Sequence, residues 1–510
     1  MIKLSLDRDG DNPLYVQIRE EIRKQIDQRQ LSVGDKLPTV SQFAKEIGVT
    51  QATIRRAYED LIKEGLLGSH VGRGTFVCDP SRSLSPKPVK ETSGVSRNMN
   101  LVDSEFLLAA RRLRMGIAKN LDDLMILAQR PGLISFTSGI PDPAFIEEGV
   151  LQRLALDALK NGQMPYQGYG ENLGMFELRK EIARRYSEPG CKITPDQVLI
   201  TNGSQQGVSV LAQAALESGQ RVICETPCYM GIPRAFGAIG HWVESVPRDK
   251  DGPIPERLYR LGDNRQTLFY TCPELHNPMG TDISSSRQKV IVDWAQENRA
   301  IIIADQIFHD IRFEESSPTS FLSELGPEQT VVIGSLSKSY MCGLRVGWMI
   351  SSQERIQSIV SLKRAMDISS PPLMQGIALS LLKSGIYDDH LVKVRQYYQE
   401  RCATLLDALK KYMPEGITWT EPKGGFHMWL DLPKGYSSIV LFLLAIEKGV
   451  AIAPGPTMDV DHRFVNGFRL SYAPLSLKEI REGVELLSAA VVKLLKESPS
   501  EPGLSGLGDF

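Results

Sequence analysis

The first eighty residues contain three segments whose apolar residues recur at the spacing of an amphipathic helix. The first has one apolar residue in every four: Leu14, Ile18, Ile22 and Ile26. A second helix is expected over residues 40–47, after the hydroxyl cap Thr39 and before Gly48. A third is expected after Thr50, with an apolar side made of Ile54, Tyr58, Leu61 and Ile62. Residues 66–77 then form two short apolar stretches around a glycine-rich tip, which predicts a hairpin.

Two helices joined by a glycine turn and followed by a hairpin are the layout of a winged helix-turn-helix. The second helix of this motif, here the one after Thr50, offers polar and arginine side chains to base edges. The hairpin, called the wing, approaches the phosphates. The residues expected to contact DNA are Thr50, Gln51, Thr53, Arg55, Arg56, His70, Gly72 and Arg73. The alternative is a small helical domain with a hairpin and no DNA partner. Residues 1–78 hold 12 Lys and Arg against 11 Asp and Glu, so DNA binding would depend on local charges and dimerisation.

The rest of the chain divides by composition. We expect the DNA-binding domain over residues 12–80, a flexible Ser/Pro/Lys-rich linker over 81–103, and a disordered tail over 498–510. Residues 104–130 form an amphipathic helical lead-in that packs either on the next domain or on a partner subunit. Residues 131–492 form the large domain.

Short β-branched runs alternate with helical segments in the large domain, which predicts an α/β fold with a mostly parallel sheet covered on both faces. The expected strands are 198–201, 221–224, 267–271, 300–304, 331–334 and 346–350. Ligands of such sheets bind at the carboxyl ends of the strands. The residues just beyond those ends include a lysine, a carboxylate, an amide, an aromatic ring, hydroxyls and an arginine. Pyridoxal 5'-phosphate (PLP) requires this combination, because it needs a Schiff-base lysine, a carboxylate for its pyridinium and a cationic phosphate cup.

Two resemblances add to this interpretation. PLYVQIREEIRKQI, VGDKLPTVSQFAKEIGVTQATIRRAYEDLIKEGLL and GRGTFV resemble the GntR-type winged helix over residues 12–78. The chain departs from that family at Ser41, where an arginine is common, and at Gln51, where an arginine or a similar donor is common. The operator sequence and affinity are therefore not transferable. SGIPD, TNGSQQG, HNPMG, SLSKSYMCGLRVGW, PKGGFHMW and NGFRLSYA resemble class I/II aminotransferases of fold type I, which have a mostly parallel sheet and a smaller α+β domain.

The second resemblance implies a role for each matching residue. Lys338 matches the Schiff-base lysine, Asp305 the partner of the pyridinium, and Arg469 the arginine that binds an amino acid's α-carboxylate. The remaining cofactor contacts are Asn277 at O3', Tyr229 on the ring, and Ser204, Gln205, Ser335 and Arg345 at the phosphate, with Tyr169 reaching the neighbouring subunit's phosphate.

A GntR-type domain, a linker and an aminotransferase-like domain resemble the MocR-type bacterial regulators over the whole chain. The resemblance implies a regulator that binds operator DNA, senses PLP or its adduct with an amino acid or amine, and forms a homodimer through the large domain. The rival interpretation is a working aminotransferase with an accessory DNA-binding domain, and turnover measurements distinguish the two. A PLP-storage or chaperone protein has no sequence feature in its favour.

Phe308 is relevant to this choice. The family commonly has a tyrosine at this position, three residues after the aspartate, and its hydroxyl donates to O3' of PLP. Phenylalanine keeps the packing and loses the donor, which predicts weak catalysis. The alternative is that the alignment slips and Tyr340 or Tyr270 supplies the bond.

Composition excludes other classes. Hydrophobic residues make up 42% and charged residues 24% of the 510 residues, which is typical of a folded globular protein. No apolar run of 18 residues or secretory signal occurs, so we expect a cytoplasmic protein without a membrane partner. The seven cysteines are scattered, and no His or second Cys pair accompanies Cys224 and Cys228, so reduced thiols and no metal site are expected.

Overall fold

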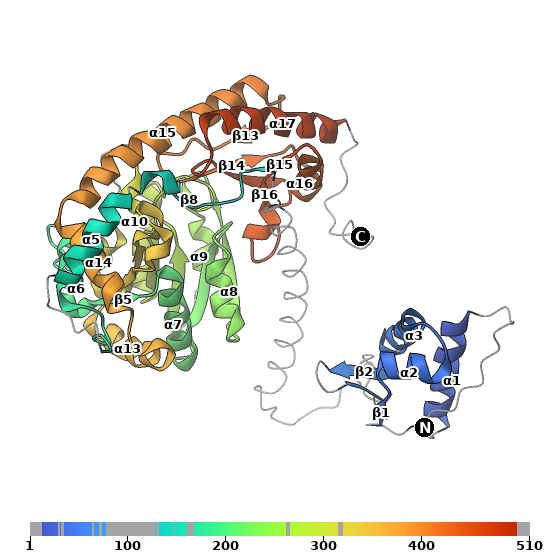
Figure 1. Cartoon of the computed structure of the whole chain (residues 1–510). Coiled ribbons are helices and arrows are strands. Elements are labelled where there is room, and N and C mark those ends of the chain that lie inside the picture. The colour runs from blue at the N-terminus through green and yellow to red at the C-terminus, as the bar shows by residue number, and fades with distance from the viewer. Residues whose placement is uncertain are drawn as a thin grey trace. The chain divides into compact units, whose positions relative to one another are not determined.

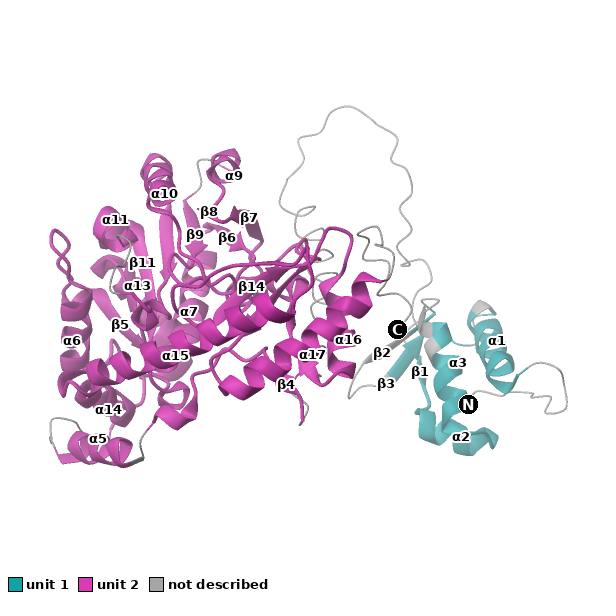
Figure 2. Ribbon diagram, turned by 90° about the horizontal axis from the view of Figure 1, so that it is seen from above, with its two compact units in different colours: residues 1–98 teal, residues 99–510 magenta. Residues whose placement is uncertain are grey.

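The computed structural model describes residues 13–28, 31, 35–63, 66–70, 74–77, 128, 132–146, 148–160, 168–261, 266–314 and 320–496. The chain divides into two compact units, residues 1–98 and 99–510 (Figure 2). The predicted linker, nearly all of the helical lead-in and the tail lie outside the described residues. None of the described helices is long and apolar enough to span a membrane.

The described part of the first unit contains three helices and a small sheet. The helices are α1 (Leu14–Asp27), α2 (Val40–Ile47) and α3 (Gln51–Lys63), and the antiparallel sheet has the order β1-β3-β2, with β1 Lys36–Leu37, β2 Leu67–His70 and β3 Gly74–Val77. Thr39 and Gln42 form a capping box at the start of α2, and Gly48 ends it at φ 68°. Ile22, Phe43 and Ile54 have no exposed area and form the core with their neighbours. The predicted helices are present, and β1 is an additional strand that the sequence analysis did not identify.

The second unit is built around a large sheet with helices packed around it (Figure 1). The sheet has eight strands in the order β5-β12-β11-β10-β9-β6-β7-β8. Its strands are β5 (Val198–Thr201), β6 (Arg221–Thr226), β7 (Val243–Asp249), β8 (Gly252–Pro253), β9 (Thr267–Thr271), β10 (Ile301–Asp305), β11 (Thr330–Ser335) and β12 (Gly347–Ile350). The pairs formed by β7, β6, β9, β10 and β11 are parallel, whereas β12 runs antiparallel to both neighbours. The predicted mostly parallel sheet is therefore confirmed.

Helices cover both faces of this sheet because alternate strand residues point to opposite sides. On one face, Leu268 and Ile303 pack with α7 (Ser204–Glu217), α8 (Gly231–Ala238) and α13 (Gln353–Asp367). On the other face, Phe269 and Ile302 pack with α9 (Pro255–Arg260), α10 (Ser285–Glu297) and α11 (Phe321–Gln329). The central strands are consequently buried at every position.

A second sheet of four antiparallel strands has the order β13-β14-β17-β16, with β13 Thr418–Trp419, β14 His427–Asp431, β16 Ala453–Pro454 and β17 Gly467–Ser471. The long helix α15 (Ile386–Tyr412) packs against α17 (Leu477–Leu495), which also contacts α16 (Ser438–Glu447). The other described elements are α5 (Glu148–Lys160), α6 (Phe176–Tyr186), α12 (Leu336–Ser339), α14 (Pro372–Lys383), the paired β4 (Ile134–Ser135) and β15 (Val450–Ala451), and short 3-10 helices at 143–145, 195–197, 309–311, 342–344 and 455–458.

Candidate functional site

The parallel strands place the candidate residues at one edge of the large sheet. Asp305 is the last residue of β10, Ser335 ends the neighbouring β11, and Lys338 lies in α12 directly after it. Asn277 follows β9 on the other side of β10. The carboxyl ends of adjacent parallel strands meet at the same edge, which is where ligands of such sheets bind.

The Lys338 amine is held inside the protein. Its Nζ donates to the carbonyl oxygen of Gly139 at 2.6 Å. Burial lowers the pKa of Lys338, and the positive charge of Arg469 contributes in the same direction. A lowered pKa favours the neutral amine, which is the nucleophilic form.

Asp305 is 3% exposed and accepts two hydrogen bonds. The Tyr270 hydroxyl donates to Oδ2 at 2.8 Å, and the Ile307 backbone N–H donates to Oδ1 at 3.3 Å. Burial nevertheless raises the pKa of Asp305 to about 6. A cationic N–H placed against this carboxylate would favour the ionised form again.

The N-terminus of α7 forms an anion cradle with Arg345. Gly203 precedes the helix at φ 82°, without a side-chain cap, so the first amide N–H groups of α7 at Ser204 and Gln205 are available to a ligand. A Cβ on Gly203 would lie 2.5 Å from the Arg345 guanidinium, so glycine is needed for this close approach. Arg345 Nη2 donates to the Asn202 carbonyl oxygen at 2.9 Å, which holds the guanidinium at the helix start.

Ser335 and Gln205, which the sequence places at the phosphate, are hydrogen-bonded to other parts of the protein. Ser335 Oγ accepts from the Ser337 backbone N–H at 3.1 Å and lies 3.0 Å from the Val346 carbonyl oxygen. Gln205 Nε2 donates to the Gly231 carbonyl oxygen at 2.9 Å, and the Tyr229 hydroxyl lies 3.5 Å from Gln205 Oε1. The Tyr229 ring is 43% exposed. These contacts fix the orientation of the ring beside the cradle.

Arg469 and Asn277 form a second polar group at the same edge. Arg469 Nη1 donates to Asn277 Oδ1 at 2.9 Å, and Nη2 donates to the Thr137 carbonyl oxygen at 2.6 Å. Arg469 Nε is buried and has no partner among the described residues. Burial lowers the pKa of Arg469 to about 10. A buried guanidinium with a free N–H provides a strong site for a carboxylate.

Phe308 is buried, with 1% of its area exposed. Its ring packs edge-on against Phe426 and His427, with centroid distances of 5.4 and 5.3 Å. The hydroxyl of Tyr270 donates to Asp305, and the ring of Tyr340 packs against His390 at 4.8 Å. The Tyr270 hydroxyl is therefore already used by Asp305, which weakens the alternative interpretation for that residue.

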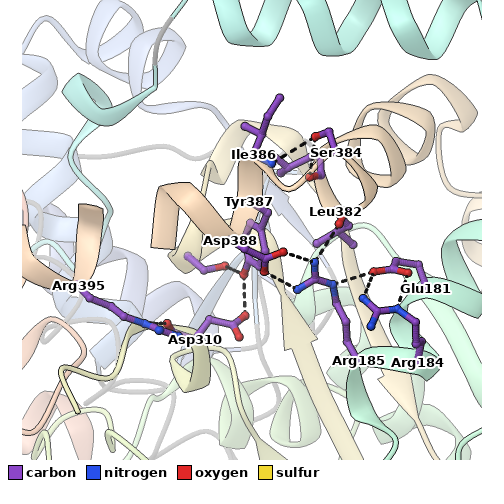
Figure 3. A network of polar contacts seen from close by, with 12 residues as sticks. Glu181, Arg184, Arg185, Asp310, Leu382, Ser384, Ile386, Tyr387, Asp388 and Arg395 are labelled. Carbon is purple, nitrogen blue, oxygen red and sulfur yellow. Dashed lines mark hydrogen bonds and ion pairs between the residues drawn. The ribbon is translucent and has the colours of Figure 1, made fainter. Parts of the chain in front are cut away.

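A polar network supports the segments that carry Lys338 and Asp305 (Figure 3). The Tyr387 hydroxyl donates to Asp310 Oδ2 at 2.6 Å and lies 2.7 Å from the hydroxyl of Ser339, the neighbour of Lys338. Arg395 Nε donates to the Asp310 carbonyl oxygen at 2.8 Å. The start of α15 is thereby tied both to α12 and to the loop that follows β10.

Several residues of this site were not identified from the sequence. The Gly139 and Thr137 carbonyl oxygens contribute through contacts that join segments far apart in the chain. Tyr270 was named only as an alternative donor to O3', and its hydrogen bond to Asp305 was not predicted. His427 lies within the quoted stretch PKGGFHMW, and a histidine among glycines and aromatic residues was the available signal. Tyr169 is 77% exposed, and no contact among the described residues assigns its role.

The predicted DNA-contacting residues lie mostly on α3. Thr50 caps the helix, accepting from the Thr53 backbone N–H at 3.3 Å, and the side chains of Gln51 and Arg55 are exposed. The Arg56 guanidinium stacks over the Tyr15 ring at 4.1 Å. His70 ends β2, and Gly72 and Arg73 lie outside the described residues.

Comparison with known families identifies both units. Residues 132–487 match the family described as aminotransferase class I and II, and residues 14–77 match the bacterial regulatory proteins of the gntR family.

Individual relatives support the same division. A 2-aminoadipate transaminase of Thermus thermophilus is 33% identical over 383 residues, covering 74% of this chain and 95% of the relative. An uncharacterised HTH-type transcriptional regulator of Bacillus subtilis, YdfD, is 27% identical over 94% of this chain and 97% of its own length. The crystal structure of the T. thermophilus α-aminoadipate aminotransferase LysN, complexed with N-(5'-phosphopyridoxyl)-L-leucine, superposes with a TM-score of 0.67 at 31% identity, over 72% of this chain and 94% of that one.

Proposed function

Because this chain belongs to the class I and II aminotransferases and carries a gntR-family domain before that fold, the MocR-type arrangement, we propose that it is a transcriptional regulator controlled by PLP. The signal is PLP itself or its adduct with an amino acid or amine, and the output is binding to double-stranded operator DNA. The observation that carries this proposal is the partly buried Lys338 amine at the same sheet edge as Asp305, in a chain with a helix-turn-helix domain.

The residues at the sheet edge fit PLP. The α7 N-terminus and Arg345 suit its phosphate, and the glycine at 203 leaves the room that a side chain would fill. Asp305 suits the pyridine nitrogen, and Asn277 and Tyr229 suit the ring oxygen and the ring face. When bound, PLP supplies an aldehyde for covalent capture of amines and a ring that withdraws electrons.

The amino acid or amine effector is assigned to the Arg469 side of the site. The unpartnered Nε of Arg469 and the Asn277 amide are placed to bind a carboxylate. The neutral form of Lys338, favoured by burial, is the form that would attach PLP, and the Gly139 carbonyl oxygen holds the Lys338 Nζ in place.

A working amino acid aminotransferase is the second candidate function. The 33% identity to a 2-aminoadipate transaminase over most of the large unit favours it. Phe308, which lacks the hydroxyl common at this position, favours the regulator with weak catalysis instead.

We also propose a homodimer formed through the large unit and a cytoplasmic location beside the DNA. The exposed Tyr169 is assigned to the neighbouring subunit's phosphate cradle, which supports a shared site. Light scattering of the PLP-loaded protein is expected to give twice the mass of one chain, and a stable monomer would contradict the shared site.

Covalent attachment of PLP at Lys338 is the first test of this proposal. The purified protein is expected to be yellow, and borohydride reduction followed by peptide mapping is expected to place PLP on Lys338. Lys338→Ala is expected to lose the covalent link and to keep the fold, whereas Lys383→Ala, at an exposed lysine paired with Glu177, is expected to keep the link. Attachment to another lysine would contradict the assignment of the site.

A further inference from the structure

His427 is a buried histidine that the proposed function has not used. It begins β14 opposite Ser471 of β17, and Trp429 lies opposite Arg469 in the same register. Residues opposite each other in antiparallel strands share a face, and so do residues two apart along a strand. His427 and Arg469 therefore lie on the same face of the four-stranded sheet.

One nitrogen of the imidazole is bonded and the other is not. Nδ1 lies 2.9 Å from the Ser471 hydroxyl. Nε2 is buried and has no hydrogen-bond partner among the described residues, and the side chain as a whole is 1% exposed. Buried polar atoms are nearly always bonded, so a free ring nitrogen indicates a partner that the protein itself does not supply.

The surroundings of the ring place it at the Lys338 site. A Cβ on Gly139 would lie 2.6 Å from His427 Cε1, so the ring packs directly against the residue whose carbonyl oxygen accepts from Lys338. Phe308 packs edge-on on the ring at 5.3 Å. The imidazole is thus oriented by Ser471 and packed by Gly139 and Phe308.

The charges around His427 define the chemistry of the missing partner. Burial lowers the pKa of His427 well below its usual range, and the positive charges of Arg469 and Lys338 lower it further. The ring is therefore neutral and carries one proton. In the tautomer in which the Ser471 hydroxyl donates to Nδ1, that proton is on Nε2. A neutral N–H donor beside the Arg469 guanidinium complements an anionic oxygen.

We propose that His427 is a specificity-determining residue whose Nε2–H donates to the carboxylate of the bound amino compound, beside Arg469. This inference rests on the proposed function. It narrows the effector class to α-amino acids, because an amine without a carboxylate leaves both His427 Nε2 and Arg469 Nε unbonded. An amine that binds here leaves these buried N–H donors without an acceptor, which costs binding free energy. The site therefore discriminates against amines in favour of amino acids.

The test uses the full-length, PLP-loaded protein and pairs of ligands that differ only in the carboxylate. L-leucine is compared with isopentylamine and L-alanine with ethylamine, and the dissociation constants are obtained from the change in cofactor absorbance. His427→Phe keeps a ring and removes both nitrogens. His427→Gln places an amide nitrogen near the position of Nε2, and His427→Asn places one only near Nδ1.

We expect His427→Phe and His427→Asn to weaken the binding of both amino acids about tenfold or more, and to change amine binding by less than about twofold. His427→Gln is expected to restore most of the affinity for the amino acids. Ser471→Ala, which keeps the imidazole and removes the group that orients it, is expected to give a smaller loss in the same direction. Thermal unfolding and the PLP content of each variant establish that it is folded and loaded.

Three results would overturn the inference. One is an equal loss of affinity for amino acids and amines, and another is a wild-type protein that responds to none of the amino acids. The third is an altered spectrum of the loaded protein without ligand, with amino acid affinity unchanged, which would assign Nε2 to an oxygen of the cofactor. All three are measured on loaded protein, whereas failure of the proposed function appears earlier, as a chain that does not attach PLP.

Discussion

Burial shifts the pKa values of Asp305 and Lys338, the two ionisable groups at the sheet edge, in opposite directions. It raises the pKa of Asp305 to about 6 and lowers the pKa of Lys338, so both groups shift towards their neutral forms. A ligand that brings a positive N–H to Asp305 stabilises the ionised carboxylate, and an aldehyde beside Lys338 reacts with the neutral amine. The same two side chains thus suit one cofactor from opposite ends of its ring.

Phe308 sets the expected rate of chemistry at this site. Phe308→Tyr is expected to add a donor near the cofactor's ring oxygen and to speed half-transamination of bound amino acids, because a hydrogen bond to a charged oxygen contributes about 1.5–3 kcal/mol. Single-turnover absorbance kinetics measure this rate. The control is Phe426→Tyr, at the ring that packs edge-on against Phe308. An unchanged rate in Phe308→Tyr would contradict the assignment of this position.

Helix α3 is the element that we expect to enter the DNA groove. The side chain of Arg55 is exposed one turn after the cap Thr50, and Arg55→Ala is expected to cost about 1–3 kcal/mol of DNA binding and to relax one operator position. Fluorescence anisotropy with DNA from the region upstream of the gene measures this loss. Arg19→Ala is the matched control, because Arg19 lies on α1 and is paired with Glu20 at 2.6 Å. If both variants bind DNA equally well, α3 is not the helix that enters the groove.

The elements with strong sequence periodicity were the ones that could be predicted. The runs at 198–201 and 267–271 coincide with β5 and β9, because strands that are buried on both faces are short, mostly apolar segments whether they lie at the edge or in the middle of the sheet. The antiparallel direction of β12 could not be predicted, since a buried strand has the same composition in either direction. The strands β1 and β13 were not predicted, because a strand of two residues is too short to show an alternation of apolar and polar positions.

The residue pattern alone predicted the site where a residue follows a strand, whereas Arg469, inside β17, was assigned from the family resemblance. Asp305, Ser335 and Lys338 are adjacent to strand ends, so the topology brings them together. The Tyr270 hydroxyl reaches Asp305 from the neighbouring strand, and the Gly139 carbonyl oxygen reaches Lys338 from the segment that follows β4. His427 packs against Gly139 and Phe308. No local pattern encodes these contacts.

At the scale of the whole molecule, the two units are expected to be coupled through ligand binding. Coupling between two sites is a free energy, so an effector that changes DNA affinity must bind with different affinity to the DNA-bound and free protein. The Tyr387 hydroxyl links the start of α15 to Ser339, beside Lys338, so α15 contacts the segment at which we propose that PLP is attached.

The most direct test of the central claim is the DNA affinity of the full-length protein without PLP, with PLP, and with PLP plus an amino acid or amine panel. We predict that PLP or its adduct changes the affinity for operator DNA by about 5–150-fold, a typical range for allosteric coupling, and that Lys338→Ala abolishes the change. DNA affinity that is the same in all three states, together with transamination at about 10 per second as in a median enzyme, would contradict the account and identify the chain as a working aminotransferase.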